Sequence, residues 1–420
     1  MSTPSPNTLK QKYAELLVRT GLNVQKGQCV FISAELAHAE MVRLIAAEAY
    51  KVGAKYVRVE WRDTPIQKAR FLHSDPAHYE YSPEFEVAMY NNMAQGGWVR
   101  LALTGDSFPD IFADVDPNVM RRVNTARSKA IKPYTNAIMA NKFQWCVAAV
   151  PTTAWAQKIF PGMEPAQAMD ELWRLIFLIT RADQPDPVAA WDAHDAALRR
   201  IATDLRERGV RTLRFFDPAP NAEGKPSTDL RVGLTDAPFW VAAGSNTQDG
   251  VRFFANIPTE EIFTSPHRLR VDGYVRTSKP SFPMEREVVD ATFYFQNGEV
   301  QKFTAAKGAD TLAQFFEIRN AKFLGEVALV DDRSPINQAG VLFYDTLFDE
   351  NAACHIAFGT AYDEGLIGAE YMTTEEKFAA GLNDADTHVD FMIGTPTMNV
   401  TGLCADGREI AVMREGEFVI

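Results

Sequence analysis

The first half of the chain alternates between short apolar segments and amphipathic helical segments, and this pattern restricts the fold more than any other feature. Residues 29–33, 56–61, 99–103 and 143–150 have the composition of strands. Between the first two, apolar residues recur at helical spacing as far as Gly53, a residue typical of a helix C-terminus. Strands separated by helices predict a mostly parallel sheet that is covered by helices.

Glycine-rich phosphate loops are missing from this half. No GxGxxG follows a strand and no GxxxxGK[ST] occurs anywhere in the sequence. We therefore expect the α/β half to serve as a scaffold without a nucleotide cofactor.

The pattern changes after a proline-containing break at residues 184–188, which a long helix follows up to about Gly209. Shorter strand-like segments and turns come next. We therefore expect an N-terminal α/β domain at residues 1–195 and a C-terminal α+β domain at residues 196–420.

Several segments of the second half predict antiparallel hairpins. Residues 212–216, 230–234 and 326–330 are apolar and strand-like. Asn-Gly at 297–298 and Asp-Gly at 406–407 lie between such segments, where these dipeptides favour tight hairpin turns.

Composition excludes several classes of protein. Apolar residues make up 46% of the chain and charged residues 23%, as in globular proteins, and 43 basic against 55 acidic residues give a net charge of −12. Such a surface repels nucleic acid.

The N-terminus lacks a signal-peptide pattern, and no apolar stretch is long enough to span a bilayer. The cysteines are scattered without a CxxC pair, so we expect a soluble cytoplasmic protein.

His388 and Asp390 form the first candidate site. They precede an apolar run, which predicts a strand. Residues two apart on a strand face the same side, so both side chains would lie together while Val389 packs on the opposite side. Imidazole beside carboxylate suits a metal ion, although a hydrogen-bonded pair at a strand end explains the pattern equally well.

Residues 347–355 supply two further candidates, Glu350 and His355. Residues 352–359 have helical composition, so the two side chains would converge near an irregular helix start. Acidic residues are also favoured at helix N-termini without any metal, and this explanation stays open.

Three glutamates complete the candidates. Glu326 opens an apolar strand and would share its face with Ala328 and Val330, where a buried charge needs a partner or a metal. Glu260 and Glu261 follow Asn-Ile-Pro-Thr and, taken alone, favour a solvated helix start.

Together these segments resemble the metal-dependent aminopeptidases of the thermophilic type, the aminopeptidase T and S family. The resemblance covers nearly the whole chain, and its motifs are NIPTEEIFTSPH (256–267), GEVALV (325–330), LFYDTLFDENAACHIAFG (342–359), HVDFMIG (388–394) and, in the first half, GLNVQKG (21–27) and VAAWDAH (188–194). Every matched position keeps the expected residue type.

The resemblance implies two divalent ions per chain, which would be zinc, cobalt or manganese. The implied ligands are Glu261, Glu326, Glu350, His355, His388 and Asp390. Glu260 is the alternative to Glu261 and otherwise a catalytic candidate, for proton transfer or for binding the substrate's amino group. Tyr362 would orient or donate to the carbonyl oxygen of the substrate.

The implied function is a cytoplasmic, homodimeric aminopeptidase that cleaves short peptides with a water activated by both ions. A related hydrolase acting on a non-peptide amide is one alternative. A ring-cleaving dioxygenase is another, with a single iron held by His355, His388 and Asp390. The additional glutamates argue against a single iron. A metal-stabilised binding protein without activity is a further alternative.

Overall fold

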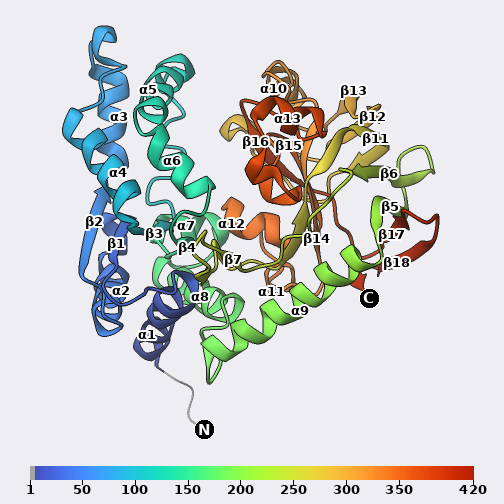
Figure 1. Ribbon diagram of the computed structural model, residues 1–420. Coiled ribbons are helices and arrows are strands. Elements are labelled where there is room, and N and C mark those ends of the chain that lie inside the picture. The colour runs from blue at the N-terminus through green and yellow to red at the C-terminus, as the bar shows by residue number, and fades with distance from the viewer. Residues whose placement is uncertain (1–4) are drawn as a thin grey trace. The chain divides into compact units, whose positions relative to one another are not determined.

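The structure is a computed structural model that describes residues 5–420, and the chain divides into two compact units. The first unit runs to Asp192 and also takes in Gly244–Pro258. The second unit consists of Ala193–Ala243 and Thr259–Ile420. The chain is therefore mixed α/β, and each unit has sheets of its own (Figure 1).

A five-stranded parallel sheet forms the centre of the first unit. Its strands, in spatial order, are β2 (Tyr56–Arg62), β1 (Cys29–Glu35), β3 (Val99–Thr104), β4 (Trp145–Ala149) and β9 (Asn256–Ile257). This confirms the parallel sheet that the alternation of strands and helices predicts. A short hairpin of β7 (Ser245–Asn246) and β8 (Arg252–Phe253) belongs to the same unit.

Helices separate these strands along the chain. They are α1 (Pro6–Leu16), α2 (Ala39–Lys51), α3 (Thr64–His73), α4 (Glu84–Gly96), α5 (Pro117–Ala130), α6 (Lys132–Met139), α7 (Thr153–Ile159) and α8 (Pro165–Ile179). Side chains of Asp63, Asp116 and Thr152 cap the N-termini of α3, α5 and α7, which fixes where these helices begin. Helix α9 (Pro187–Glu207) contains the division between the units. No helix among the described residues is both long and apolar enough to cross a membrane.

An eight-stranded antiparallel sheet dominates the second unit. In spatial order its strands are β13 (Glu299–Thr304), β12 (Thr292–Gln296), β11 (Pro266–Arg276), β6 (Pro226–Leu234), β5 (Val210–Pro220), β17 (Asn399–Cys404), β18 (Glu409–Arg414) and β19 (Glu417–Phe418). Both predicted hairpin turns are confirmed. Asn297-Gly298 joins β12 to β13 with positive φ at both residues, and Asp406-Gly407 lies between β17 and β18.

A second sheet of four antiparallel strands carries the candidate site. Its order is β10 (Glu261–Thr264), β14 (Leu324–Val330), β15 (His355–Gly359) and β16 (His388–Met392). The prediction of a helix at residues 352–359 is wrong. Helix α12 (Thr346–Asp349) and a 3-10 turn, η5 (Glu350–Ala352), come first, and strand β15 follows them. All of β15 is buried between two neighbouring strands, so ladder hydrogen bonds decide its conformation.

Aromatic packing anchors one face of this sheet. Phe358 of β15 lies 4.9 Å from Phe293 of β12 and 5.4 Å from Phe391 of β16, measured between ring centroids. The ring centroid of Phe316 lies 5.3 Å from that of Phe358. The remaining helices of the second unit are short: α10 (Ala309–Phe315), α11 (Pro335–Gln338) and α13 (Thr374–Ala379). This apolar face holds the sheet rigidly, which leaves the other face for charged groups.

Candidate metal centre

Strand register gathers the ionisable residues on the face opposite the aromatic core. Residues directly opposite in an antiparallel ladder project to the same side. Ala328 pairs with His355, Ala357 with Asp390 and Gly359 with His388. Alternation along β14 and its pairing with β10 bring the glutamates to this face as well. The residues on this face are Glu261, Glu326, His355, His388 and Asp390. The same-face prediction for His388 and Asp390 is confirmed.

Small residues lie among these charged side chains. Ala328, Ala357 and Gly359 occupy the ladder positions between the ligand candidates, so these three positions add little side-chain bulk to the face. Gly359 has a φ of +116°, and a Cβ there would meet the backbone oxygen of Thr387 at 2.0 Å. Glycine is therefore required at that position, and these three small residues form the floor of the candidate site.

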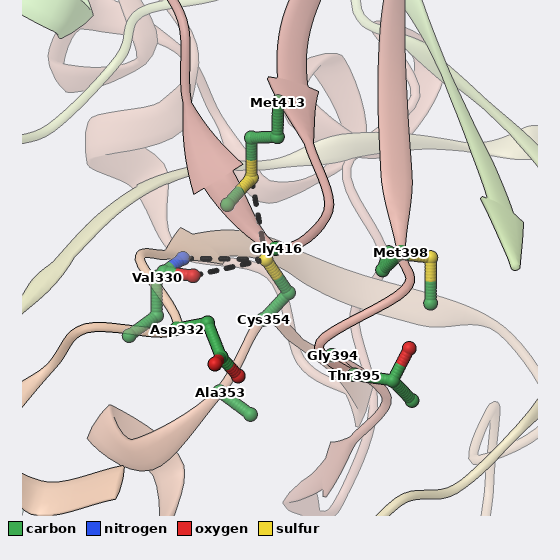
Figure 2. A pocket seen from close by; sticks show the side chains of 9 residues that line it. All are labelled: Val330, Asp332, Ala353, Cys354, Gly394, Thr395, Met398, Met413 and Gly416. Atoms are coloured by element: carbon green, nitrogen blue, oxygen red, sulfur yellow. Dashed lines mark hydrogen bonds between the residues drawn. The ribbon is translucent and has the colours of Figure 1, made fainter. Parts of the chain in front are cut away.

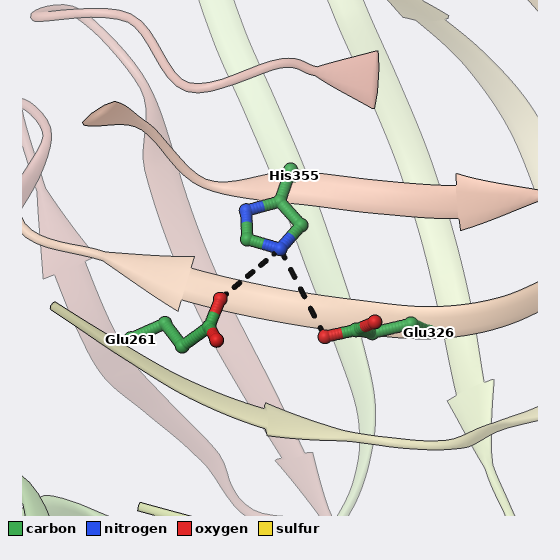
Figure 3. A group of neighbouring side chains, drawn as sticks. All are labelled: Glu261, Glu326 and His355. Atoms are coloured by element: carbon green, nitrogen blue, oxygen red, sulfur yellow. Dashed lines mark ion pairs between the residues drawn. The ribbon is translucent and has the colours of Figure 1, made fainter. Parts of the chain in front are cut away.

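The first group of possible metal ligands consists of Glu261, Glu326 and His355. Figure 3 shows both carboxylates directed at the same imidazole nitrogen. His355 Nε2 lies 3.2 Å from Glu261 Oε2 and 3.8 Å from Glu326 Oε1. His355 is only 1% exposed, so this group is almost completely removed from water.

The second group consists of Glu326, His388 and Asp390. His388 Nε2 lies 3.2 Å from Glu326 Oε2 and 3.6 Å from Asp390 Oδ1. Glu326 belongs to both groups, and each of its two oxygens faces a different histidine. A carboxylate in this position is suited to link two neighbouring cations.

Backbone carbonyl groups fix both histidines. The Nδ1 atom of His355 lies 3.1 Å from the oxygen of Ala353, and Nδ1 of His388 lies 2.8 Å from the oxygen of Thr360. A hydrogen on each Nδ1 donates to these carbonyls, so each Nε2 is left to face the carboxylates. Metal-binding histidines are oriented in this way in many proteins.

Electrostatics show that the cluster lacks positive charge. Burial raises the pKa of Glu261, and burial together with the charge of Asp390 raises the pKa of Glu350. Burial opposes ionisation of Glu326 too, but hydrogen bonding to both histidines outweighs it and lowers its pKa to about 2. Burial would lower the pKa of His388, yet its carboxylate partners raise it to about 11.

The donor set fits divalent cations. The Oε2 atom of Glu261 is buried and accepts no hydrogen bond of good geometry, although it faces His355. A bound cation would satisfy this oxygen and compensate the crowded carboxylates. Carboxylate oxygens with two imidazole nitrogens suit zinc, cobalt or manganese better than copper.

Glu350 lies at the edge of this cluster. It starts η5, and neither ligand group of the described residues includes it. The charges of Asp390 and Glu261 act on its carboxyl group, so the carboxyl lies near the cluster. Its Oε1 atom accepts a hydrogen bond from Nδ2 of Asn351 at 3.3 Å.

The structure separates the two adjacent glutamates. Glu261 starts β10 and joins the first ligand group, whereas the carboxylate of Glu260 lies 3.6 Å from Nε2 of His194. Both are buried, at 7% exposure for Glu260 and 8% for Glu261. The solvated helix start expected here is wrong, because the segment enters a buried strand.

Tyr362 lies beside the second group. Its ring centroid is 4.8 Å from that of His388 and 5.6 Å from that of Phe263. Ser265 Oγ donates a 2.7 Å hydrogen bond to the Tyr362 carbonyl oxygen and so fixes its backbone. Burial and the nearby carboxylates raise the pKa of Tyr362, so its hydroxyl keeps its proton.

Asn351 connects two parts of the site and is not among the residues that the sequence predicts for it. This fully buried side chain accepts a 2.7 Å hydrogen bond from the backbone N–H of Glu260 and donates to Leu347 O as well as to Glu350. Its backbone oxygen accepts from Ser334 Oγ at 2.8 Å. No residue pattern marks it; only its place inside the 342–359 motif does.

A small cavity lies next to the strand that carries His355 (Figure 2). Its volume is about 10 Å³, and its wall includes Cys354, whose Sγ lies 3.6 Å from Met413 Sδ and 3.4 Å from Val330 N and O. Space for one water cannot hold a peptide. The charged face of the sheet, not this cavity, is the candidate site.

Comparisons with known proteins show the family of the whole chain. Residues 7–418 match the model of the family described as thermophilic metalloprotease (M29). Aminopeptidase 2 of Geobacillus stearothermophilus is 39% identical over 97% of both chains, and aminopeptidase T of Thermus thermophilus is 38% identical over 98% of both. The solved structure of wild-type AmpT from Thermus thermophilus superimposes with a TM-score of 0.91 at 35% identity, covering 99% of this chain and all of that one.

Proposed function

Because the chain belongs to the thermophilic metalloprotease (M29) family, we propose that it removes N-terminal residues from short peptides with the help of two divalent metal ions. The single observation that carries the two-ion proposal is the position of Glu326, whose two oxygens face two different histidines. The relatives that match over nearly the full chain are aminopeptidases by name.

The chain's own residues would hold the ions in two adjoining places. We assign one ion to Glu261, Glu326 and His355, and the other to Glu326, His388 and Asp390. Glu350 completes the set from the edge of the cluster. Bound ions of this kind acidify water and polarise a carbonyl oxygen.

The remaining groups would act on the substrate. The Tyr362 hydroxyl keeps its proton and lies beside His388, so we assign it the role of a hydrogen-bond donor to the carbonyl oxygen. We keep Glu260 as the group for proton transfer or for binding the free amino group. Its carboxylate lies near His194, whose Nε2 also lies 2.9 Å from the oxygen of Thr259.

The dioxygenase alternative is not favoured. A single iron on His355, His388 and Asp390 would leave Glu261 and Glu326 buried on the same face without charge compensation. The names of the relatives likewise do not favour a non-peptide amide as substrate.

We also propose a cytoplasmic homodimer. All four cysteines are free in the structure, as in a reducing compartment. Light scattering measures the mass in solution, and an active monomer would contradict the dimer.

Elemental analysis of the purified protein measures its metal content. A series of peptides from two residues to about ten, each with a free and an acetylated N-terminus, then tests the substrate class. We expect two equivalents of metal, turnover of the free peptides and poor turnover of the acetylated ones. Equal rates on both forms would contradict an aminopeptidase, and one equivalent of metal in a fully active enzyme would contradict the two-ion site.

A further inference from the structure

One face of the parallel sheet in the first unit is unusually polar. Parallel sheets covered by helices are normally apolar on both faces. Phe31 of β1 pairs with Arg58 of β2 on one side and with Arg100 of β3 on the other, so these three side chains share a face. Steps of two residues along β2 add Glu60 and Arg62 to it.

Glu60 is already compensated on this face. The hydroxyl of Tyr90 donates to both of its carboxylate oxygens, at 3.0 and 2.9 Å. Arg127 Nη2 donates to the Tyr90 oxygen at 3.0 Å and lies 3.9 Å from Glu60 Oε2. One arginine and one tyrosine therefore satisfy this glutamate.

The arginines are crowded and outnumber the glutamates. Burial lowers the pKa of Arg62; Arg100 and Arg127 lower it further, while Glu35 and Glu60 oppose them. Glu86 also acts on Arg127, and Arg58 shares the face. Four arginines thus lie near three carboxylates, which leaves one surplus positive charge among these groups. Arg62 Nη2 donates to Leu103 O at 2.7 Å, which fixes its direction.

Arg100 is the uncompensated member of this group. It is half-buried, and in the part of the chain that the structure describes no carboxylate pairs with its guanidinium group. Glu35, another acidic residue of this region, accepts a hydrogen bond from the backbone of Ser107 at 3.1 Å.

Tyr134 of α6 presents a second unsatisfied group beside Arg100. It is 4% exposed, and its buried hydroxyl has no hydrogen-bond partner among the described residues. Its ring lies 5.0 Å from that of Tyr90, and Arg100 is near enough for its charge to act on the hydroxyl. A buried hydroxyl without a partner is unfavourable, so a hydrogen-bond acceptor placed beside it would stabilise this part of the chain.

We propose that Arg100 and the hydroxyl of Tyr134 bind an oxyanion, the phosphate or carboxylate group of a small molecule, on this face of the sheet, and that Arg62 contributes positive charge nearby. A guanidinium group donates two parallel hydrogen bonds to such an anion, and the tyrosine hydroxyl supplies a further donor. The anion also neutralises the surplus positive charge. The site lies in the first unit and does not depend on the aminopeptidase activity.

Thermal unfolding of the full chain tests the proposal, with inorganic phosphate and succinate as probes and sodium chloride at matched ionic strength as the reference. We expect a saturable rise in Tm with at least one probe. A response to phosphate alone assigns a phosphorylated ligand, and a response to succinate alone assigns a carboxylate. A rise no greater than that in chloride, with both probes, overturns the proposal.

Three variants make the test specific. Arg100→Gln should weaken anion binding at least tenfold. Tyr134→Phe should weaken anion binding severalfold. Without anion, the Tm of this variant should be the same as that of the unmodified chain or higher, because the unsatisfied hydroxyl is gone. Arg174→Gln is the control, since Arg174 pairs with Glu171 on α8 away from this face, and should respond like the unmodified chain.

The variants also separate the proposal from a structural explanation. Peptidase activity should be unchanged in all three, since none of these residues belongs to the metal centre. If Tyr134→Phe lowers the Tm without anion and leaves anion affinity unchanged, the hydroxyl is structural and the proposal is wrong. Equal anion affinity in Arg100→Gln and the unmodified chain refutes it as well.

Discussion

Replacing Glu326 by glutamine should remove both metal ions at once. This carboxylate is the only member common to the two ligand groups of the described residues, so its loss leaves each group with one histidine and one carboxylate. Glu350 lies outside both groups, so each keeps two ligands, which are too few for a catalytic site of this type with its normal three. The Glu326→Gln chain should therefore hold neither ion and have no measurable turnover.

The same change should destabilise the metal-free protein. The pKa of Glu326 falls from 4.5 to about 2 on folding, and this difference corresponds to about 3 kcal/mol in favour of the ionised form. Glutamine mimics the neutral form and loses that contribution at pH 7. For a unit of this size, the loss lowers Tm by roughly 6–12 °C. The carboxylate's contribution is present above pH 4.5 and disappears as pH falls through about 2.

Elemental analysis and unfolding after treatment with a chelator measure both effects. Asp390→Asn is the matched control: it leaves Glu261, Glu326 and His355 intact, so it should keep one ion. The reasoning is refuted if Glu326→Gln retains one ion while Asp390→Asn loses both, or if metal-free Glu326→Gln is as stable as the unmodified chain.

Further changes test single contacts of the site. Glu350→Gln should abolish nearly all turnover with the circular dichroism spectrum intact, and a near-normal rate with both ions present would remove Glu350 from the centre. Val389→Ala removes packing on the opposite face, so it should cost about 1 kcal/mol in denaturant unfolding and leave metal content unchanged; lost metal would reverse the face assignment. Asn351→Ala should reduce metal affinity by about 10–100-fold in a competition titration, because Glu260 N–H and Glu350 lose their common partner, and unaltered affinity would contradict this. Burial raises the pKa of Asp349 to about 7, so its proton stabilises the fold below pH 4 and this stability is lost as pH rises through 7; Asp349→Asn should remove up to about 4 kcal/mol of that pH dependence, and an identical stability profile would exclude it.

Local patterns in the sequence were sufficient for part of the site. The two-residue spacing of His388 and Asp390 places both on one face because strand alternation is a property of the backbone itself. The same rule places Glu326 with Ala328. The turn at Asn297-Gly298 is equally local, since its positive φ angles favour these residue types.

Other features depend on contacts distant in sequence. Residues 356–359 are apolar without alternation because both faces of β15 are buried, so their composition does not distinguish a strand from a helix. The choice between Glu260 and Glu261 depends on where β10 begins, and pairing with β14 decides this. Asn351 was missed because its partners lie on three different segments.

The floor of Ala328, Ala357 and Gly359 has a consequence for how this enzyme tolerates genetic variation. None of the three bears a group that reacts with or binds anything, yet their small side chains leave the room that the proposed ions and substrate would need. A valine at 357 would be unremarkable in any buried strand, and it would obstruct the centre while leaving every ligand in place. Inactive natural variants of this protein can therefore arise although every ligand candidate is kept. A search for lost activity has to inspect the three small residues of the floor as well as the ligands.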